Sequence, residues 1–129
     1  MSTKNVIFTD QLPAAVGPYS QAIESDGFVF ASGMLPIDPA TGNMREGSIA
    51  DRAHQALTNI KAVAEAAGCT LDDIVKTTVF LTDVNDFKEV NAVYAEYFNE
   101  PFPARSAFQV AALPLGADIE IEVIFRKKN

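Results

Sequence analysis

A guanidinium and a carboxylate near the end of the chain are the side chains best suited to chemistry on a small acid. Arg105 stands in Phe102-Pro103-Ala104-Arg105-Ser106, before an apolar run over 107–113 that predicts a strand. A guanidinium fixed there can bind a planar carboxylate, because its forked N–H donors match two oxygens at once. Glu120 lies on a second run, 119–125, which we expect to return antiparallel and approach Arg105. The pair indicates a site for small acids, with a surface Arg–Glu ion pair as the open alternative.

The acidic residues around Glu120 have a simpler interpretation when they are considered alone. Asp118, Glu120 and Glu122 alternate with Ile119 and Ile121. Such alternation is typical of a strand with one solvated face, so all three acids could simply face water.

Composition limits the classes of partner. A length of 129 residues predicts one domain over residues 1–129. Ten Lys and Arg against seventeen Asp and Glu give a net charge of −7, which disfavours binding to nucleic acid and to anionic lipid. Cys69 is the only cysteine, so we expect no intrachain disulfide and no cysteine metal cluster. Residues 1–5 lack the pattern of a signal peptide and no apolar run could span a membrane, which favours a soluble cytoplasmic protein without metal.

The elements that must position these side chains are two helices and several strands. Ser48 is a suitable N-cap for a first helix over Ile49 to Ala67, and Gly68 is a natural stop. A second helix should begin at Asp83 or Asn85, continue through Phe98 and end at Pro101 and Pro103. Strands are expected at 6–9, near 20–23, at 28–32, at 74–82 and in the two C-terminal runs, with a loop over 12–19 and a turn over 38–42.

The strands are apolar on both of their faces, which predicts an oligomer. Phe30 should face one way and Val29 the other, and Ile74 and Phe80 should oppose Val79. Two helices crossing between strands should lie on one face of a mixed sheet, by the right-handed crossover rule. A second copy of the chain is the simplest cover for the other face, so we expect sheets that meet in an oligomer.

Five short segments carry a resemblance to a known family over essentially the whole chain, from about Ala14 to Phe125. They are Gly17-Pro18-Tyr19-Ser20-Gln21, Ala31-Ser32-Gly33-Met34-Leu35-Pro36, Val79-Phe80-Leu81-Thr82-Asp83-Val84-Asn85-Asp86-Phe87, Val90-Asn91 and Phe102-Pro103-Ala104-Arg105-Ser106. In this order they resemble the reactive intermediate deaminase family, also called RidA/YjgF.

The resemblance implies a fold, an assembly and an activity. The fold is chorismate-mutase-like α/β (α+β), with sheets packed in a homotrimer and one cleft at each subunit interface. The activity is cofactor-free hydrolysis of 2-imino acids and their 2-enamino tautomers to 2-oxo acids and ammonia, as in a 2-iminobutanoate/2-iminopropanoate deaminase. Such enzymes limit metabolite damage by intermediates that leak from pyridoxal-phosphate enzymes.

The resemblance also implies roles for single residues. Arg105 matches the carboxylate-binding arginine, and Glu120 resembles the carboxylate that positions or activates water. Many members have a cysteine where this chain has Ala107, which excludes a thiol mechanism here and leaves only a backbone contact from residue 107. The remaining cleft-lining positions carried over from the family are Tyr19, Ser32, Gly33 and Asn91.

Several of these residues have structural interpretations as well. Tyr19 could pack on the core, Ser32 could form a strand-end turn, and Asn91 could be a buried amide that ties helix to strand. His54 is expected at a solvated helix position, and Cys69 is expected to be a packed or half-exposed thiol.

Three classes of function remain open. The first is the imine deaminase, and the second is a non-catalytic, small-carboxylate-binding trimer with a regulatory or chaperone-like role. Arg105 would serve both, and Glu120 separates them. The third is a protein-binding or chaperone-like role, or the RNA cleavage sometimes attributed to the family. The acidic charge and the lack of a His pair disfavour RNA cleavage.

Overall fold

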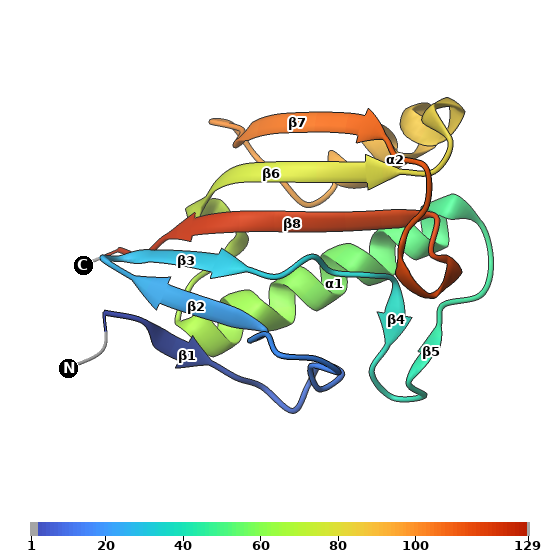
Figure 1. Cartoon of the computed structure of the whole chain (residues 1–129). Helices are drawn as coiled ribbons and strands as arrows, with labels where there is room; N and C mark the ends of the chain where they lie inside the picture. Colours follow the sequence, from blue (N-terminus) through green and yellow to red (C-terminus); the bar gives the residue numbers. More distant parts are fainter. Residues whose placement is uncertain (1–2, 129) are drawn as a thin grey trace.

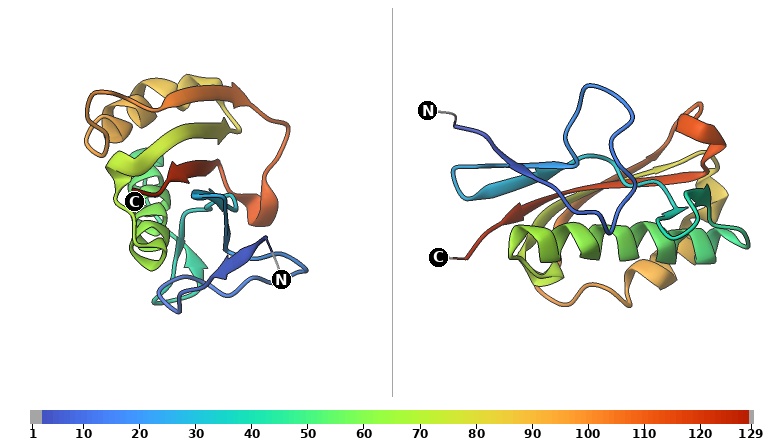
Figure 2. Two further views of the ribbon diagram at one scale, coloured as in Figure 1. Left: turned by 90° about the vertical axis from the view of Figure 1, so that its left-hand side faces the viewer. Right: turned by 90° about the horizontal axis from the view of Figure 1, so that it is seen from below.

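The computed structural model describes residues 3–128 and shows a mixed six-stranded sheet with both helices on one face (Figure 1, Figure 2). The strands follow the order β1-β2-β3-β8-β6-β7, and β6–β7 is the parallel pair among antiparallel neighbours. The predicted mixed sheet with two helices on one face is confirmed. The strands are β1 (Asn5–Ile7), β2 (Ala22–Ser25), β3 (Phe28–Ala31), β6 (Ile74–Leu81), β7 (Ala104–Gln109) and β8 (Ile119–Arg126), with a separate hairpin of β4 (Ile37–Asp38) and β5 (Asn43–Met44).

Helix α1 (Ile49–Ala67) has the boundaries that the sequence predicts. Ser48 Oγ accepts a hydrogen bond from the Asp51 N–H, and the Asp51 carboxylate accepts one from the Ser48 N–H, so the two form a capping box. Gly68 ends the helix in a left-handed conformation at φ 73°, which glycine adopts without strain. The buried face of α1 packs under the sheet through Leu57 and Ile60, which are fully buried.

Helix α2 (Phe87–Tyr94) is shorter than predicted. A 3-10 turn over Val84–Asp86 precedes it, where Asp83 accepts a hydrogen bond from the Asn85 N–H. The predicted helix end at Pro101 is wrong, because the α-helix ends at Tyr94 and only turn-type bonds from the Glu96 and Tyr97 N–H groups follow its last turn. Phe98 is nevertheless buried, so its apolar position reports packing of the following segment and not helix.

The pairing of the C-terminal strands differs from the prediction. β7 and β8 run in opposite directions but are not neighbours, because β6 lies between them and pairs with both. The predicted orientation of Ile74 is also wrong. A bulge between Ile74 and Lys76 turns the Ile74 side chain into the core beside Phe125 and leaves Val75 exposed. Local apolar patterns could not reveal either feature, since both depend on the partner strand.

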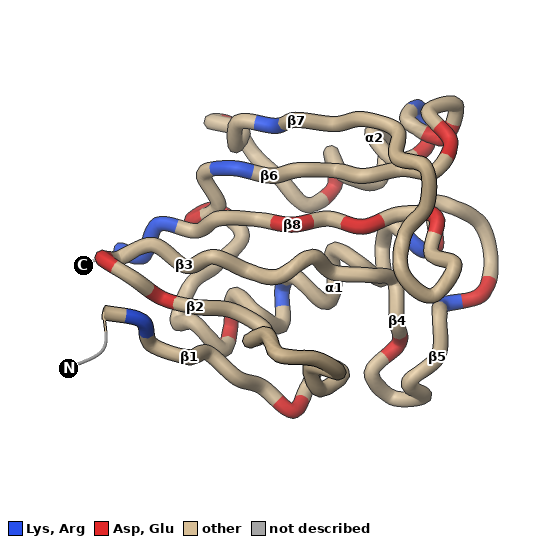
Figure 3. Tube along the Cα trace, in the orientation of Figure 1, with Lys and Arg blue, Asp and Glu red and all other residues tan. Residues whose placement is uncertain are grey.

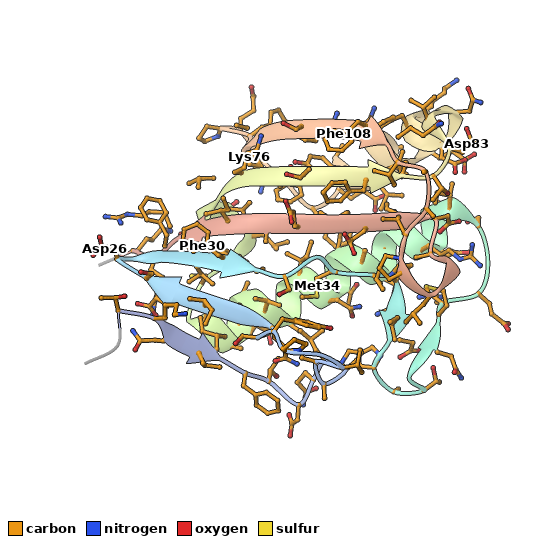
Figure 4. The ribbon with its side chains drawn as sticks, viewed as in Figure 1. Asp26, Phe30, Met34, Lys76, Asp83 and Phe108 are labelled. Carbon is orange, nitrogen blue, oxygen red and sulfur yellow. The ribbon has the colours of Figure 1, made fainter. Side chains whose placement is uncertain are left out.

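Within residues 3–128, no helix covers the side of the sheet away from α1 and α2, and we call this side the open face. Figure 4 shows Phe30, Lys76 and Phe108 on this side. Phe30 and Phe108 are each 47% exposed, and Phe108 meets the Phe80 ring edge-on at 5.3 Å between centroids. The Lys76 ammonium donates to Ser106 Oγ at 2.8 Å. The open face is therefore an exposed aromatic surface with a few polar groups.

Two other expectations concern the ends and the membrane. The expected lack of a signal peptide rests partly on residues 1 and 2, which lie outside the described residues. Within residues 3–128, neither helix combines the length and the apolar character needed to cross a membrane.

Candidate active site

A cleft of about 660 Å³ opens where the N-terminal loop meets the start of β8. The loop between β1 and β2 rises on the side of the sheet away from α1, as the views in Figure 2 show. Leu12, Val16, Met34 and Leu115 give the cleft apolar walls. Glu120 is the charged residue among the described residues that line it, so a single carboxylate lies in mostly apolar surroundings.

Glu120 enters the cleft from the open face of β8, where its backbone pairs with Phe80. Burial raises the pKa of its carboxyl, and the like charge of Glu122 adds to the increase. No side chain or backbone group of residues 3–128 pairs with this carboxylate. A half-buried carboxylate with a raised pKa and no partner in its own chain can accept a proton from a bound water.

Gly33 makes room for this carboxylate. A Cβ at residue 33 would lie 2.6 Å from Glu120 Cδ and 2.8 Å from Oε2, closer than real contacts allow. The neighbouring residue, Met34, exchanges backbone hydrogen bonds with Ile121, which brings residue 33 against β8. The absence of a side chain at Gly33 therefore sets where the Glu120 carboxylate can lie.

Ser32 and Tyr19 also line the cleft. The Ser32 hydroxyl donates to the Ser20 carbonyl at 2.6 Å, and its N–H donates to the Gln21 carbonyl at 2.9 Å. These bonds join the loop to the end of β3, and the Ser32 oxygen keeps acceptor capacity. Tyr19 is 53% exposed, so the alternative that it packs on the core is wrong.

Two buried amides that the sequence reasoning missed hold the cleft walls. Gln21 accepts from the Thr9 N–H and donates to the Thr9 and Pro13 carbonyls, so it fixes the N-terminal loop. Asn59 on α1 donates to the Leu35 carbonyl at 3.1 Å and to the Ile37 carbonyl at 2.9 Å. The available signal was an amide at an apolar-face position of α1, because a buried amide must find hydrogen-bond partners.

Arg105 belongs to a second arrangement, which we call the arginine group: Arg105, Asn91 and Tyr94. Arg105 Nη1 donates to Asn91 Oδ1 at 2.8 Å, and its Cζ lies 4.9 Å from the centre of the Tyr94 ring. Asn91 is exposed on α2, so the alternative of a buried structural amide is wrong, although it does tie the helix to β7. Ala107 shares the face of β7 with Arg105, since the residues alternate along the strand.

Arg105 and Glu120 do not meet within one chain, contrary to the sequence expectation. Arg105 pairs with Thr77, whose side chain is buried on the helix side, and Glu120 pairs with Phe80 on the open face. Figure 3 shows acidic positions along β8 and basic positions toward one end of β6 and β7. The surface Arg–Glu pair is therefore also wrong, because the two charges project from opposite faces of the sheet.

The remaining candidates lie apart from the cleft. Asp118 does not simply face water, because it accepts from Arg52 Nη1 at 2.8 Å and joins α1 to the start of β8. His54 is half-buried, and its Nδ1 lies 2.8 Å from the Tyr97 hydroxyl, so it is less solvated than predicted. Cys69 is a buried thiol, and desolvation raises its pKa. Residues 3–128 contain no cluster of His, Cys, Asp and Glu arranged to hold a metal ion.

Comparison with known proteins places this geometry in a family. The family model described as Endoribonuclease L-PSP matches residues 9–126. A RutC family protein of Pyrococcus horikoshii is 53% identical over 125 residues, covering 97% of this chain and 99% of that protein. The 2-iminobutanoate/2-iminopropanoate deaminase of Bos taurus is 52% identical over 121 residues, covering 94% of this chain and 88% of that protein.

A solved structure agrees with these sequence matches. The crystal structure of E. coli TdcF with bound serine has a TM-score of 0.90 and 42% identity, and the match covers 96% of this chain and 99% of that one. The extent and identity of these matches leave one conclusion: the chain belongs to the reactive intermediate deaminase (RidA/YjgF) family, whose model carries the Endoribonuclease L-PSP description.

Proposed function

We propose that this protein is a cytoplasmic imine deaminase that hydrolyses 2-imino acids and their 2-enamino tautomers to 2-oxo acids and ammonia without a cofactor. Its working form is a chorismate-mutase-like homotrimer of a single RidA/YjgF-like domain over residues 1–129. The identity to the bovine deaminase supports the reaction. The observation that carries the proposal is the Glu120 carboxylate, half-buried in an apolar cleft with a raised pKa and no partner in its chain.

The reaction requires a base and an anchor for the substrate carboxylate. Water adds to the carbon of the protonated imine, so a C–O bond forms while Glu120 accepts the water proton. The same proton then passes to the nitrogen of the resulting carbinolamine, which becomes an ammonium group. The C–N bond breaks, ammonia leaves, and Glu120 accepts the hydroxyl proton as the carbonyl of the 2-oxo acid forms. The tautomeric 2-enamino acid enters the same sequence after protonation at its β-carbon.

Two chains must supply the site if Arg105 and Glu120 act on one substrate. Arg105 lies on the helix side of edge strand β7, and Glu120 lies on the open face of β8. A copy of the chain docked on the open face could bring its own Arg105 to the cleft of its neighbour. The exposed aromatic surface around Phe30 and Phe108 supports such docking, because apolar area of this kind is stabilised by burial. Tyr19, Ser32 and Gly33 would then line the cleft from one chain, with Asn91 and the backbone of Ala107 contributed beside Arg105.

Orientation is the contribution of Arg105 in this scheme. A bidentate pair with the substrate carboxylate fixes which face of the imine carbon meets the water, and such positioning can supply several kcal/mol. The pair also neutralises the substrate charge, which would otherwise be repelled by ionised Glu120.

A non-catalytic carboxylate-binding trimer is the second candidate. The arginine group favours it, because a held guanidinium can bind a small acid whether or not chemistry follows. The TdcF structure contains bound serine, which is compatible with either candidate. RNA cleavage is disfavoured by the net charge of −7 and by the position of His54, which does not line the cleft.

The decisive experiment measures ammonia and 2-oxo acid release from imines generated in situ by an amino-acid oxidase. Deaminase activity requires release faster than the spontaneous rate, rising with added protein until imine formation by the oxidase becomes limiting. A heat-inactivated sample is the control for release that does not need folded protein. Release at the spontaneous rate, together with saturable binding of 2-oxobutanoate, would replace the deaminase with the binding trimer.

A further inference from the structure

We infer that Tyr94 is the positioning residue that orients the Arg105 guanidinium for the substrate carboxylate. The inference rests on the proposed function, since it concerns how that site binds its substrate. It assigns a role in binding to a residue that does not itself touch the substrate.

Arg105 is held on two sides of its guanidinium. Its Cζ lies 4.9 Å from the centre of the Tyr94 ring, and Nη1 donates to Asn91 Oδ1 at 2.8 Å. The ring contact fixes the plane of the guanidinium, and the amide fixes its rotation within that plane. Without the ring, the guanidinium of an exposed arginine on an edge strand would sample many rotamers.

The two contacts leave the Nε and Nη2 edge of the guanidinium available for a ligand. A guanidinium has five N–H donors, and the bond to Asn91 uses only the Nη1 end. Within residues 3–128, no acceptor pairs with the Nε and Nη2 edge, which is the edge that can bind a carboxylate through two parallel bonds. A neutral aromatic platform is suited to this purpose, because a carboxylate in its place would compete with the substrate.

The Tyr94 ring is itself fixed by the protein interior. Its hydroxyl lies 2.9 Å from Thr77 Oγ1, and Thr77 is fully buried on β6 beside β7. Its ring packs on Phe98 with 4.4 Å between the ring centroids, and Tyr94 is only 8% exposed. The core thus determines the position of the ring, and the ring determines the position of an exposed cation.

The test compares three variants as assembled proteins. Tyr94→Leu removes the platform, and Tyr94→Phe keeps the ring but removes the hydroxyl. Tyr97→Leu is the matched control, because Tyr97 lies on the same segment and contacts His54 instead of Arg105. Each variant is assayed for the KM and kcat of imine hydrolysis, for the Kd of 2-oxobutanoate and for thermal stability.

If Tyr94 is a positioning residue, Tyr94→Leu should weaken substrate binding and Tyr94→Phe should not. Tyr94→Leu should raise the KM and the Kd roughly three- to thirtyfold, because it removes a cation–π contact that also orders the guanidinium. Tyr94→Phe should stay within about threefold of the wild type, since the quadrupole of the ring is kept. Similar losses of thermal stability in Tyr94→Leu and Tyr97→Leu, with KM and Kd unchanged in both, would overturn the inference and leave Tyr94 a core residue.

A spectroscopic readout separates this inference from the proposed function. The Arg105 Nε–H resonance should carry a ring-current shift that persists in Tyr94→Phe, disappears in Tyr94→Leu and is unchanged in Tyr97→Leu. An inactive wild type that shows this pattern and the same split in Kd would contradict the deaminase but uphold the positioning role. An active wild type whose Arg105 resonance does not change in Tyr94→Leu would support the deaminase but contradict the positioning role.

Discussion

The arginine group and the Glu120 cleft differ in how exposed their charged side chain is and in whether it has partners in its own chain. Arg105 is exposed at a sheet edge, yet an amide and an aromatic ring hold it in place. Glu120 is half-buried among apolar walls, yet nothing in residues 3–128 pairs with it. One region presents an ordered cation and the other a desolvated anion. The difference supports the proposed roles of the two regions, and it shows that neither charge can serve as the other's partner within one chain.

The largest expected effect comes from removing the base in the cleft. Glu120→Gln should slow imine hydrolysis by roughly 10²-fold or more, because an amide cannot accept a proton from water at neutral pH. Binding of 2-oxobutanoate should persist, since Arg105 is unchanged. Steady-state kinetics and calorimetric titration of the same sample check both parts. Unchanged turnover would remove Glu120 from the mechanism and point to water held by backbone groups near Ala107.

A somewhat smaller effect is expected from the cation. Arg105→Ala should lower kcat/KM by roughly tenfold to a hundredfold, since a lost charge-assisted hydrogen bond costs about 1.5–3 kcal/mol. Arg105→Lys should recover little, because an ammonium cannot reproduce the bidentate fork. Here, unlike the Glu120 variant, binding of 2-oxobutanoate should weaken together with turnover. A folded Arg105→Ala oligomer with near-normal kcat/KM would show that the carboxylate binds elsewhere.

The separation of the two charges predicts complementation. Arg105→Ala and Glu120→Gln chains refolded together in equal amounts should regain activity, because some interfaces then combine an intact Arg105 with an intact Glu120. For a closed cyclic trimer assembled at random, about one quarter of the sites should be intact. Mixing the two proteins after separate refolding is the control and should give no recovery. If co-refolding also fails, Arg105 and Glu120 must act within the same chain or at separate sites.

The smallest effect concerns the pH dependence of the cleft. The pKa of Glu120 is raised by burial and by the neighbouring charge of Glu122. Turnover should therefore fall with decreasing pH as Glu120 becomes protonated, beginning above the pH expected for an ordinary carboxyl. Glu122→Gln should move this acid limb to lower pH, because it removes a like charge. A pH–rate profile measures the shift, and an unmoved limb would assign it to another group.

The sequence predicted best the features that depend on neighbours along the chain. The first helix was confirmed from Ser48 to Gly68, because a capping box and a left-handed glycine are local signals. The end of α2 was missed, since Phe98 continues the apolar pattern after the helix has ended at Tyr94. The bulge at Ile74 was also missed, because a bulge is a relation between two strands.

In the candidate site, too, the sequence predicted the residues of the motifs but not the features that depend on strand pairing. The motifs indicated which residue types belong together, and the structure does bring Glu120 and Gly33 to one cleft. They could not show that Arg105 projects from the other face, because the face depends on β6 lying between β7 and β8. The contribution of Tyr94 was hidden for a related reason: its spacing predicts a core residue, and its contact with Arg105 appears only after α2 packs against β7.

Because the Glu120 carboxylate has no partner in residues 3–128, the feature that suits it to accept a proton also lowers the folding stability of the single chain. The pKa of Glu120 is raised in the folded chain, so in a rising pH series the unfolded chain loses this proton first. The resulting loss of folding stability is absent below the unfolded pKa, develops between the two pKa values and is fully present above the folded one. At neutral pH, then, screening for heat resistance alone would favour uncharged residues at position 120, which the proposed mechanism expects to be inactive. Any effort to make this protein more durable would have to select for turnover at the same time.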